Sequence, residues 1–182
     1  AFNLLENLLR WTRNQNGKTK IYATLFNLTP VARQVVSLFS AIANAKEIEL
    51  INRIEGKFDI FADEDMIKTV LRNLISNAIK FTYTGGQVEL SLADSGDYWT
   101  IYVKDNGKGI PKDLQTHLLK SDEYITTYGT HNEKGSGLGL ILCRDFIRMN
   151  KGKLHFCSQE GIGTTFYFTI PKASSSAEAV SR

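Results

Sequence analysis

Apolar residues recur along this chain with two different spacings, and each spacing predicts a different kind of element. Recurrence every three to four residues predicts an amphipathic helix, whereas strict alternation predicts a strand with one buried face. The helical spacing predicts four main helices, at 1–16, 29–45, 63–79 and 137–150. Alternation predicts strands at 24–28, 47–54, 57–62, 87–94 and 98–105, and a hairpin of two strands within 152–171. Residues 111–134 have little apolar periodicity and predict a short helix followed by a mobile loop.

Local signals mark the starts of two of these helices. Thr29 before Pro30 is typical of an N-cap followed by the first helical residue. The acids at 63–65 suit the positive end of a helix dipole. Behind them a single apolar stripe predicts a central core helix, formed by Ile67, Val70, Leu71, Leu74, Ile75, Ala78 and Ile79. Because strands and helices mix, we expect an α/β (α+β) fold, a two-layer sandwich in which one mixed, mostly antiparallel sheet carries its helices on one face.

Composition and charge narrow the class of protein. The 182 residues, 42% hydrophobic and 23% charged, suffice for one soluble globular domain with its own core. A net charge of +3 without a run of Lys or Arg argues against direct binding to nucleic acid. No apolar run approaches the roughly 20 residues of a membrane span. Cys143 and Cys157 lack metal-ligand spacing, so we expect two reduced thiols in the apolar interior. The chain begins at Ala1 instead of a methionine, which suggests a piece of a longer protein.

Two asparagines lie in the predicted core helix, although asparagine is a poor helix former. Asn73 and Asn77 are four residues apart, so both amides leave the helix on one face, and Lys80 continues the same ridge. A neutral amide oxygen is a hard ligand that suits Mg²⁺, and a lysine supplies a positive charge for a phosphate. On these residues alone, an ordinary solvated helix face is an equal alternative.

A carboxylate and two glycines follow in "VKDNGKGI" (103–110). Asp105 ends a predicted strand, and Gly107 and Gly109 permit positive φ or the close approach of a ligand. A carboxylate at the rim of a pocket accepts from the exocyclic amine of adenine and repels the corresponding acceptor of guanine. The alternative is an Asn-Gly turn between two strands.

Two further segments are rich in glycine. The segment "GTHNEKGSGLGL" (129–140) runs into a predicted helix, and bare N–H groups at a helix start bind anions. It is not the dinucleotide-binding pattern, because Leu140 stands where that pattern has its last glycine, nor a Walker A loop, because Lys134 precedes the glycine. A flexible hinge is the alternative. For "GIGTTFYFTI" (161–170) the alternative is a plain hairpin.

In this order and at these spacings, the four segments resemble the nucleotide-binding boxes of the GHKL ATPase and kinase superfamily. More narrowly, they resemble the catalytic, ATP-binding domain of sensor histidine kinases over roughly 24–171, which implies the Bergerat fold. The resemblance divides the chain into the end of a dimerisation helix (1–18), the ATP-binding catalytic domain (19–172) and a linker or disordered tail (173–182). The segment "SDEYITTYGTHNEKGSGLGL" (121–140) and the short tail also resemble hybrid two-component sensors.

The resemblance implies ATP and Mg²⁺ as cofactors and gives roles to individual residues. Asn77 would hold Mg²⁺, Asn73 would lie near the reacting phosphate, and Lys80 would contact phosphate, which makes these three the catalytic set. Hydrolysing relatives carry a glutamate at position 73, and since an amide cannot act as a general base, Asn73 favours phosphoryl transfer. Asp105 would accept from the adenine amine, and Thr164 would support the adenine through water. The other implied nucleotide-binding residues are Phe81, Gly107, Gly109, Ile110, Gly135, Ser136, Gly137, Leu138, Gly139 and Leu140.

The implied activity is transfer of the γ-phosphoryl group of ATP to a histidine on a dimerisation domain. His117, His131 and His155 lack the acid and proline that follow the family's phosphoacceptor, so we expect the acceptor outside this chain. The resemblance also implies a homodimeric parent, a response-regulator receiver domain as partner, and a cytoplasmic location. Two alternatives are a non-catalytic ATP-binding regulatory module and an ATPase or serine kinase of the same fold. Leu118 and Leu119 depart from the family, which often has an aromatic residue in this lid.

Overall fold

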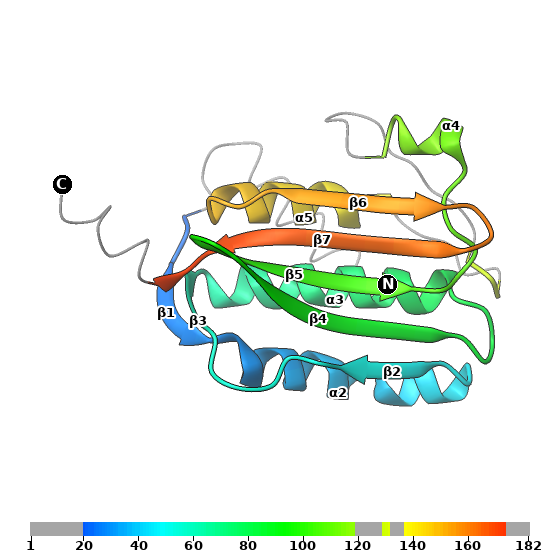
Figure 1. Cartoon of the computed structure of the whole chain (residues 1–182), viewed down its shortest axis with the longest axis horizontal. Coiled ribbons are helices and arrows are strands. Elements are labelled where there is room, and N and C mark those ends of the chain that lie inside the picture. The colour runs from blue at the N-terminus through cyan, green and yellow to red at the C-terminus, as the bar shows by residue number, and fades with distance from the viewer. Residues whose placement is uncertain (1–19, 119–128, 132–136, 174–182) are drawn as a thin grey trace.

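Three long helices cover one face of a five-stranded sheet in the computed structural model, which describes residues 20–118, 129–131 and 137–173 (Figure 1). These helices are α2 (Leu28–Ala45), α3 (Glu64–Phe81) and α5 (Gly139–Met149), and the short α4 (Lys112–Gln115) lies apart from them. The predicted two-layer sandwich with helices on one face is confirmed. The expected helix at 1–16, the loop beyond Leu118, and the tail beyond 173 lie outside the described residues.

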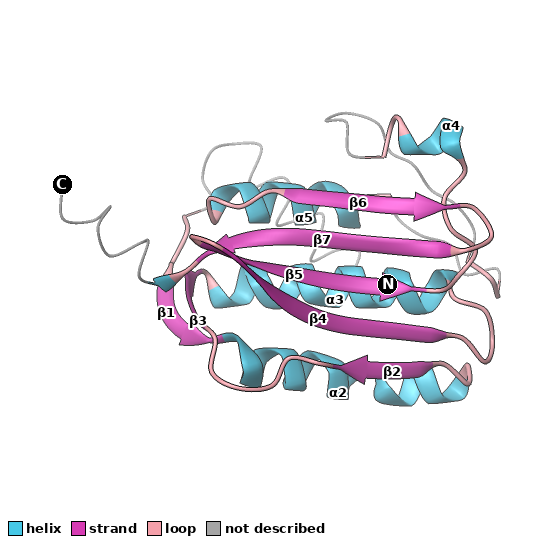
Figure 2. Ribbon diagram, viewed as in Figure 1, coloured by secondary structure: helices cyan, strands magenta, loops and turns pink. Residues whose placement is uncertain are grey.

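The main sheet is mixed and mostly antiparallel, as predicted (Figure 2). Its strands lie in the order β2 (Glu49–Asn52), β4 (Gln87–Ser95), β5 (Tyr98–Asp105), β7 (Gly163–Pro171) and β6 (Leu154–Gln159). Only the β2–β4 pair is parallel among these neighbours. The expectation of one sheet is wrong, because β1 (Thr24–Asn27) and β3 (Asp59–Ala62) form a separate antiparallel pair. A single bridge from Ile60 to Lys172 joins this pair to the chain just after β7.

The first described helix begins earlier than the sequence predicts. The N-cap of α2 is Asn27, whose Oδ1 accepts from the backbone N–H of Thr29 at 3.1 Å. The same oxygen accepts from the backbone N–H of Phe58 at 3.1 Å. Asn27 therefore caps the helix and also hydrogen-bonds the loop before β3. The predicted cap at Thr29 is therefore wrong, and its hydroxyl donates instead to the Gly56 carbonyl at 2.7 Å. Pro30 still falls in the first turn, where its missing N–H costs nothing.

Helix α3 is the centre of the core. Its predicted stripe is confirmed, since none of the seven residues is more than 3% exposed: Ile67, Val70, Leu71, Leu74, Ile75, Ala78 and Ile79. The predicted start is also confirmed, because Asp63 is the N-cap and its Oδ1 accepts from the Met66 N–H at 3.1 Å. The helix packs against α2, α5 and β5. A rigid, central helix of this kind fixes the direction of every polar side chain that it carries.

Hydrogen bonds tie the first turn of α3 to the end of α5. The Asp63 N–H donates to Asn150 Oδ1 at 2.7 Å, and Asn150 Nδ2 donates back to the Phe146 carbonyl at 2.8 Å. The segment before β1 joins the same junction, because the Tyr22 N–H donates to Asp63 Oδ2 at 2.9 Å. These bonds therefore fix α3 and α5 relative to each other. They lie at the end of the two helices away from the candidate site residues.

The two cysteines have different surroundings. Cys143 is buried in α5, where burial raises the pKa of its thiol, whereas Cys157 is exposed on β6. The prediction of two interior thiols is thus wrong for Cys157, which falls on the outward positions of an alternating strand. Neither cysteine forms a disulfide among the described residues.

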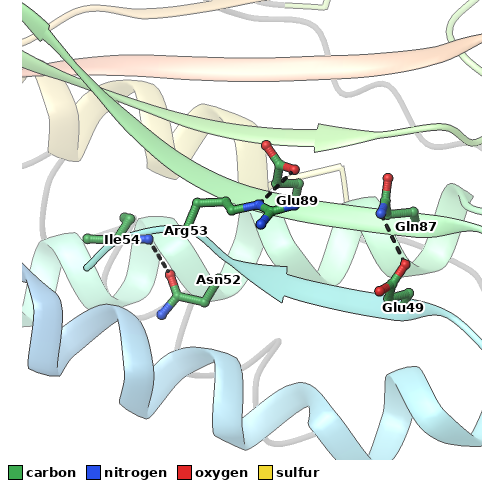
Figure 3. A network of polar contacts seen from close by, with 6 residues as sticks. All are labelled: Glu49, Asn52, Arg53, Ile54, Gln87 and Glu89. Atoms are coloured by element: carbon green, nitrogen blue, oxygen red, sulfur yellow. Dashed lines mark hydrogen bonds and ion pairs between the residues drawn. The ribbon is translucent and has the colours of Figure 1, made fainter.

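The outer surface at β2 and β4 is polar (Figure 3). Gln87 Nε2 donates to Glu49 Oε2 at 3.1 Å, and Arg53 Nε lies 3.5 Å from Glu89 Oε2. Exposed contacts of this kind contribute little to stability, so the parallel backbone pairing holds β2 in place. Within the described residues, no helix is both long and apolar enough to cross a membrane.

Candidate functional site

The predicted segments meet where β5 ends and β7 begins. Asp105 is the register partner of Thr164, so the strand-end carboxylate and the threonine lie directly opposite each other. The Lys108 N–H donates to the Phe81 carbonyl at 3.0 Å, which brings the end of α3 to the same place. The backbone N–H of Thr130 donates to the Lys80 carbonyl at 3.1 Å. Residues from all four predicted segments thus surround one end of the sheet.

Asp105 is a buried carboxylate with one oxygen held in place. It is 7% exposed, and its Oδ1 accepts from the backbone N–H of Gly107 at 2.9 Å and of Thr164 at 3.2 Å. Both described hydrogen bonds go to Oδ1, which leaves Oδ2 for a ligand. Burial raises the pKa of Asp105 from 3.8 to about 6, although the two N–H groups favour the charged form. The group is therefore charged at neutral pH and titrates just below it.

The two glycines after Asp105 are required by packing against protein backbone. A Cβ on Gly107 would lie 2.2 Å from the Phe81 carbonyl oxygen, and a Cβ on Gly109 would lie 2.0 Å from that of Gln159. Gly109 also has a φ of +67°, which side chains rarely adopt. Both glycines thus seat the loop against α3 and the β6–β7 turn, and their implied closeness to a ligand stays a prediction.

Ser158 was not predicted from the sequence, and it links three parts of the site. Its hydroxyl accepts from the Ile110 N–H at 2.9 Å and lies 2.9 Å from the Thr164 hydroxyl and 3.0 Å from the Gly163 carbonyl. The signal that could have found it is alternation. Ser158 falls on the inward side of β6 with Leu154 and Phe156, where an apolar residue is expected.

The end of α3 carries an aromatic ring that lies close to two cations. The Lys80 ammonium lies 4.5 Å from the centroid of the Phe81 ring, and that of Lys108 lies 5.1 Å away. Lys46, which the sequence did not single out, is buried and donates from Nζ to the carbonyls of Ile79 and Lys80 at 2.9 Å. A cation there satisfies the last carbonyls of the helix and suits its negative end. The end of α3 is therefore fixed while the Lys80 ammonium stays half-buried at the site.

Asn73 and Asn77 are both half-buried on α3, as the edge of the stripe predicts. Asn73 Nδ2 donates to the Thr69 carbonyl at 2.9 Å, and a Cβ on Gly139 would lie 2.9 Å from Asn73 Oδ1. The start of α5 thus lies directly against Asn73, and a side chain at residue 139 would displace the amide.

The glycine-rich segment is described from Gly137 onward, whereas Gly135 and Ser136 lie outside the described residues. Gly137 has a φ of +73°, and buried Leu138 stands at the N-cap of α5. Leu140 is half-buried and packs against the core. The Leu138 side chain has no polar atom, so no side chain caps the start of α5.

The donor set fits a metal that is shared with phosphates. The described residues contain no cluster of three or more His, Cys, Asp or Glu that could hold a metal alone. Mg²⁺ usually keeps waters and binds through one or two protein oxygens together with substrate phosphates. One amide such as Asn77, placed one helical turn before Lys80, is compatible with that mode.

Comparison with known proteins identifies relatives of this chain. A family model described as histidine kinase-, DNA gyrase B-, and HSP90-like ATPase matches residues 62–174. The adaptive-response sensory kinase SasA of Crocosphaera subtropica is 30% identical over 170 residues, which are 92% of this chain. The chain spans 44% of that relative's length.

Solved structures are similar over most of the chain. The catalytic domain of histidine kinase ThkA is 31% identical with a TM-score of 0.70, over 83% of this chain and 96% of the ThkA chain. ThkA has also been solved in complex with the response regulator protein TrrA, and that chain is 27% identical with a TM-score of 0.70, over 94% of this chain and 49% of ThkA. Full-length ShkA in complex with AMPPNP is 26% identical with a TM-score of 0.79, over 94% of this chain and 35% of ShkA.

Proposed function

This chain belongs to the histidine kinase-, DNA gyrase B-, and HSP90-like ATPase family, and within it to the catalytic domains of histidine kinases, so we propose that it binds ATP with Mg²⁺ and transfers the γ-phosphoryl group to a histidine. The acceptor histidine lies on a separate dimerisation domain. The observation that supports this proposal is the buried carboxylate of Asp105 at a strand end, whose Oδ1 accepts both of the described hydrogen bonds.

Asp105 accepts a hydrogen bond from the 6-amino group of adenine. The buried carboxylate can act only as an acceptor when it is charged, so it favours adenine over the 6-oxo group of guanine. Thr164 lies opposite and supports the adenine directly or through water, while Phe81 and Ile110 line the pocket. The base is therefore selected at the ends of two paired strands.

The triphosphate lies along α3 and the start of α5. Lys80 contributes positive charge, and Gly137 and Gly139 contribute the close backbone approach and the helix N-terminus that suit an anion. Asn77 holds Mg²⁺, which supplies charge neutralisation to the phosphates when bound. ShkA has been solved with AMPPNP, which supports a nucleotide at this kind of site.

The site favours transfer over hydrolysis. Asn73 lies against the start of α5, where its amide can position a phosphate but cannot take a proton from water. In the transfer, a P–N bond to the acceptor histidine would form as the bond to ADP breaks, ADP would leave, and the ring would give up its N–H proton. Phosphoryl transfer needs mainly positioning and charge neutralisation, which amides, glycines and a lysine provide.

Three partners complete the proposal. They are the histidine-bearing dimerisation domain, a second copy of the parent protein that makes the homodimer, and a response-regulator receiver domain. The solved complex of ThkA with TrrA supports the last of these. None of the chain's own histidines fits the acceptor: His155 is exposed on β6 and stacks on Tyr167, His131 hydrogen-bonds Thr84, and His117 follows the short α4.

The test uses ATP labelled at the γ-phosphate. The chain is incubated with Mg²⁺ and the label, alone and with the dimerisation domain of its parent protein. We expect an acid-labile, alkali-stable label on the dimerisation domain only, lost in Asn77→Ala and kept in the matched helix-surface variant Asn44→Ala. Release of free phosphate without label on the partner would indicate an ATPase instead. Nucleotide binding with neither outcome would indicate a regulatory module.

A further inference from the structure

The hydrogen bonds of Ser158 fix the direction of a neighbouring hydroxyl. Its oxygen accepts from the Ile110 N–H at 2.9 Å and contacts the Gly163 carbonyl at 3.0 Å and the Thr164 hydroxyl at 2.9 Å. A carbonyl can only accept, so Ser158 must donate its one proton to Gly163 for that contact to be a hydrogen bond. The Thr164 hydroxyl must then donate to Ser158. Only this arrangement makes all three contacts full hydrogen bonds.

The arrangement gives Thr164 a definite polarity toward the nucleotide. With its proton committed to Ser158, the Thr164 oxygen can only accept from any other partner. Thr164 is the register partner of Asp105, so the two side chains lie on the same face of the sheet. The site then presents two acceptors side by side, a carboxylate oxygen and a hydroxyl oxygen. A 6-amino group donates to such a pair, whereas a 6-oxo group meets two acceptors.

We propose that Ser158 is a specificity-determining residue, which acts by locking the Thr164 hydroxyl as an acceptor and so rejects 6-oxopurine nucleotides. This inference rests on the proposed binding of ATP. Ser158 is a positioning residue, because it acts through Thr164 and not through the nucleotide itself. Ser158 on β6 contacts both the loop after β5 and the start of β7. The direction of the Thr164 hydroxyl therefore depends on three segments that are separate in the sequence.

The substitution Ser158→Ala separates this role from a packing role. Without the serine oxygen, the Thr164 hydroxyl can rotate and donate to a 6-oxo group, so the variant gains affinity for the wrong base. A packing defect would weaken binding of every purine nucleotide by the same factor. Inosine triphosphate is the sharpest probe, because it carries an oxo group in place of the amino group of ATP and otherwise differs only in the proton on N1.

The experiment is calorimetric titration of ATP and inosine triphosphate, each with Mg²⁺, into the wild-type chain and variants. We expect Ser158→Ala to bind inosine triphosphate more tightly and to lose about fivefold of its preference for ATP, the size of one ordinary hydrogen bond. Ser158→Thr keeps a hydroxyl at this position and should keep the preference. Ser40→Ala is the matched control, because this serine donates to the Val36 carbonyl on α2, outside the site.

Thr164→Val gives an independent readout if Ser158→Ala does not fold. It removes the acceptor itself, and we expect weaker ATP binding with a smaller preference over inosine triphosphate. An unchanged preference in Ser158→Ala, or in Thr164→Val, would overturn this inference while ATP binding by the wild type upholds the proposed function. Absence of ATP binding by the wild type would overturn both.

Discussion

The two ends of the candidate site are built in different ways. At the proposed adenine end, the buried residues Asp105 and Thr164 are hydrogen-bonded to each other, and a Cβ on the glycine at 107, 109 or 163 would clash with backbone atoms. At the proposed phosphate end, half-buried Asn73, Asn77 and Lys80 lie along α3, and Asn73 lies against the start of α5. Under the proposed function, the base would be selected by groups that are part of the fold, whereas the groups for the phosphates would be carried along one helix. Changes at the adenine end should alter stability and binding together, and changes at the phosphate end should alter binding alone.

The largest effect is expected for Gly109→Ala. A Cβ there meets the Gln159 carbonyl oxygen at 2.0 Å, and we expect a loss of about 3 kcal/mol in the free energy of unfolding. Gly96→Ala is the matched control. The φ of Gly96 is +73°, close to the +67° of Gly109, but nothing lies within 4 Å of a Cβ at Gly96. We expect it to cost about 1 kcal/mol through backbone strain only. Urea denaturation of both variants makes the comparison, and equal losses would contradict the tight packing of the adenine end.

The next effect is expected for Asp105→Asn, which should stabilise the fold and weaken binding. The asparagine oxygen can keep the hydrogen bonds from Gly107 and Thr164, while the buried charge is removed. The accompanying amide donor faces the 6-amino group, so ATP affinity should fall roughly 10- to 100-fold. The rise in the pKa of Asp105 from 3.8 to about 6 implies a gain of up to about 3 kcal/mol in stability at neutral pH when the charge is removed. Thermal melts and ATP titration measure both changes, and a variant that loses stability would be evidence against a strained buried charge.

We expect the difference in stability between Asp105→Asn and the wild type to depend on pH, with a definite sign. The pKa of Asp105 rises from 3.8 to about 6 on folding, so between these values the folded chain binds more protons than the unfolded chain. Its contribution to stability therefore falls as pH rises through that window. The difference in unfolding free energy between Asp105→Asn and the wild type should be small near the lower pH of this window. It should reach its full size above the upper pH. A difference that does not change with pH would show that this carboxyl is not the titrating group.

The smallest effect is expected at the phosphate end, for Asn77→Ala. Alanine is the better helix former, so stability should stay level or rise by about 0.5 kcal/mol. ATP affinity should fall about tenfold with Mg²⁺ present and stay unchanged with EDTA, because the amide acts through the metal. Asn44→Ala controls for the loss of an asparagine from a helix surface. A fall in affinity that persists without Mg²⁺ would place Asn77 on the nucleotide itself.

Much of this molecule could be predicted because the relevant signals are local. Apolar periodicity placed the core stripe of α3, and the alternating segments placed the strands of the main sheet. Asp105 and the glycines stood out because a few residue types in a fixed order carry their chemistry. Even the start of α3 at Asp63 depends on a contact within one turn.

What could not be predicted depends on contacts between distant segments. Asn27 replaces Thr29 as a cap because the same amide also binds Phe58, and β1 leaves the main sheet because it pairs with β3. Ser158 acquires its role only when β6 meets the loop that contains Ile110. In each case a partner lies more than two dozen residues away, so the deciding contact leaves no local signal, even though asparagine is itself a common N-cap.

The most direct test of the central claim is titration of the wild-type chain with ATP and with GTP, each with Mg²⁺, in a calorimeter. The claim is that the buried carboxylate of Asp105, with one oxygen hydrogen-bonded by the protein, selects adenine in an ATP-binding kinase domain. It predicts one ATP per chain with affinity in the micromolar range and far weaker binding of GTP. Equal binding of the two nucleotides would contradict the role of Asp105, and absence of binding would contradict the site as a whole.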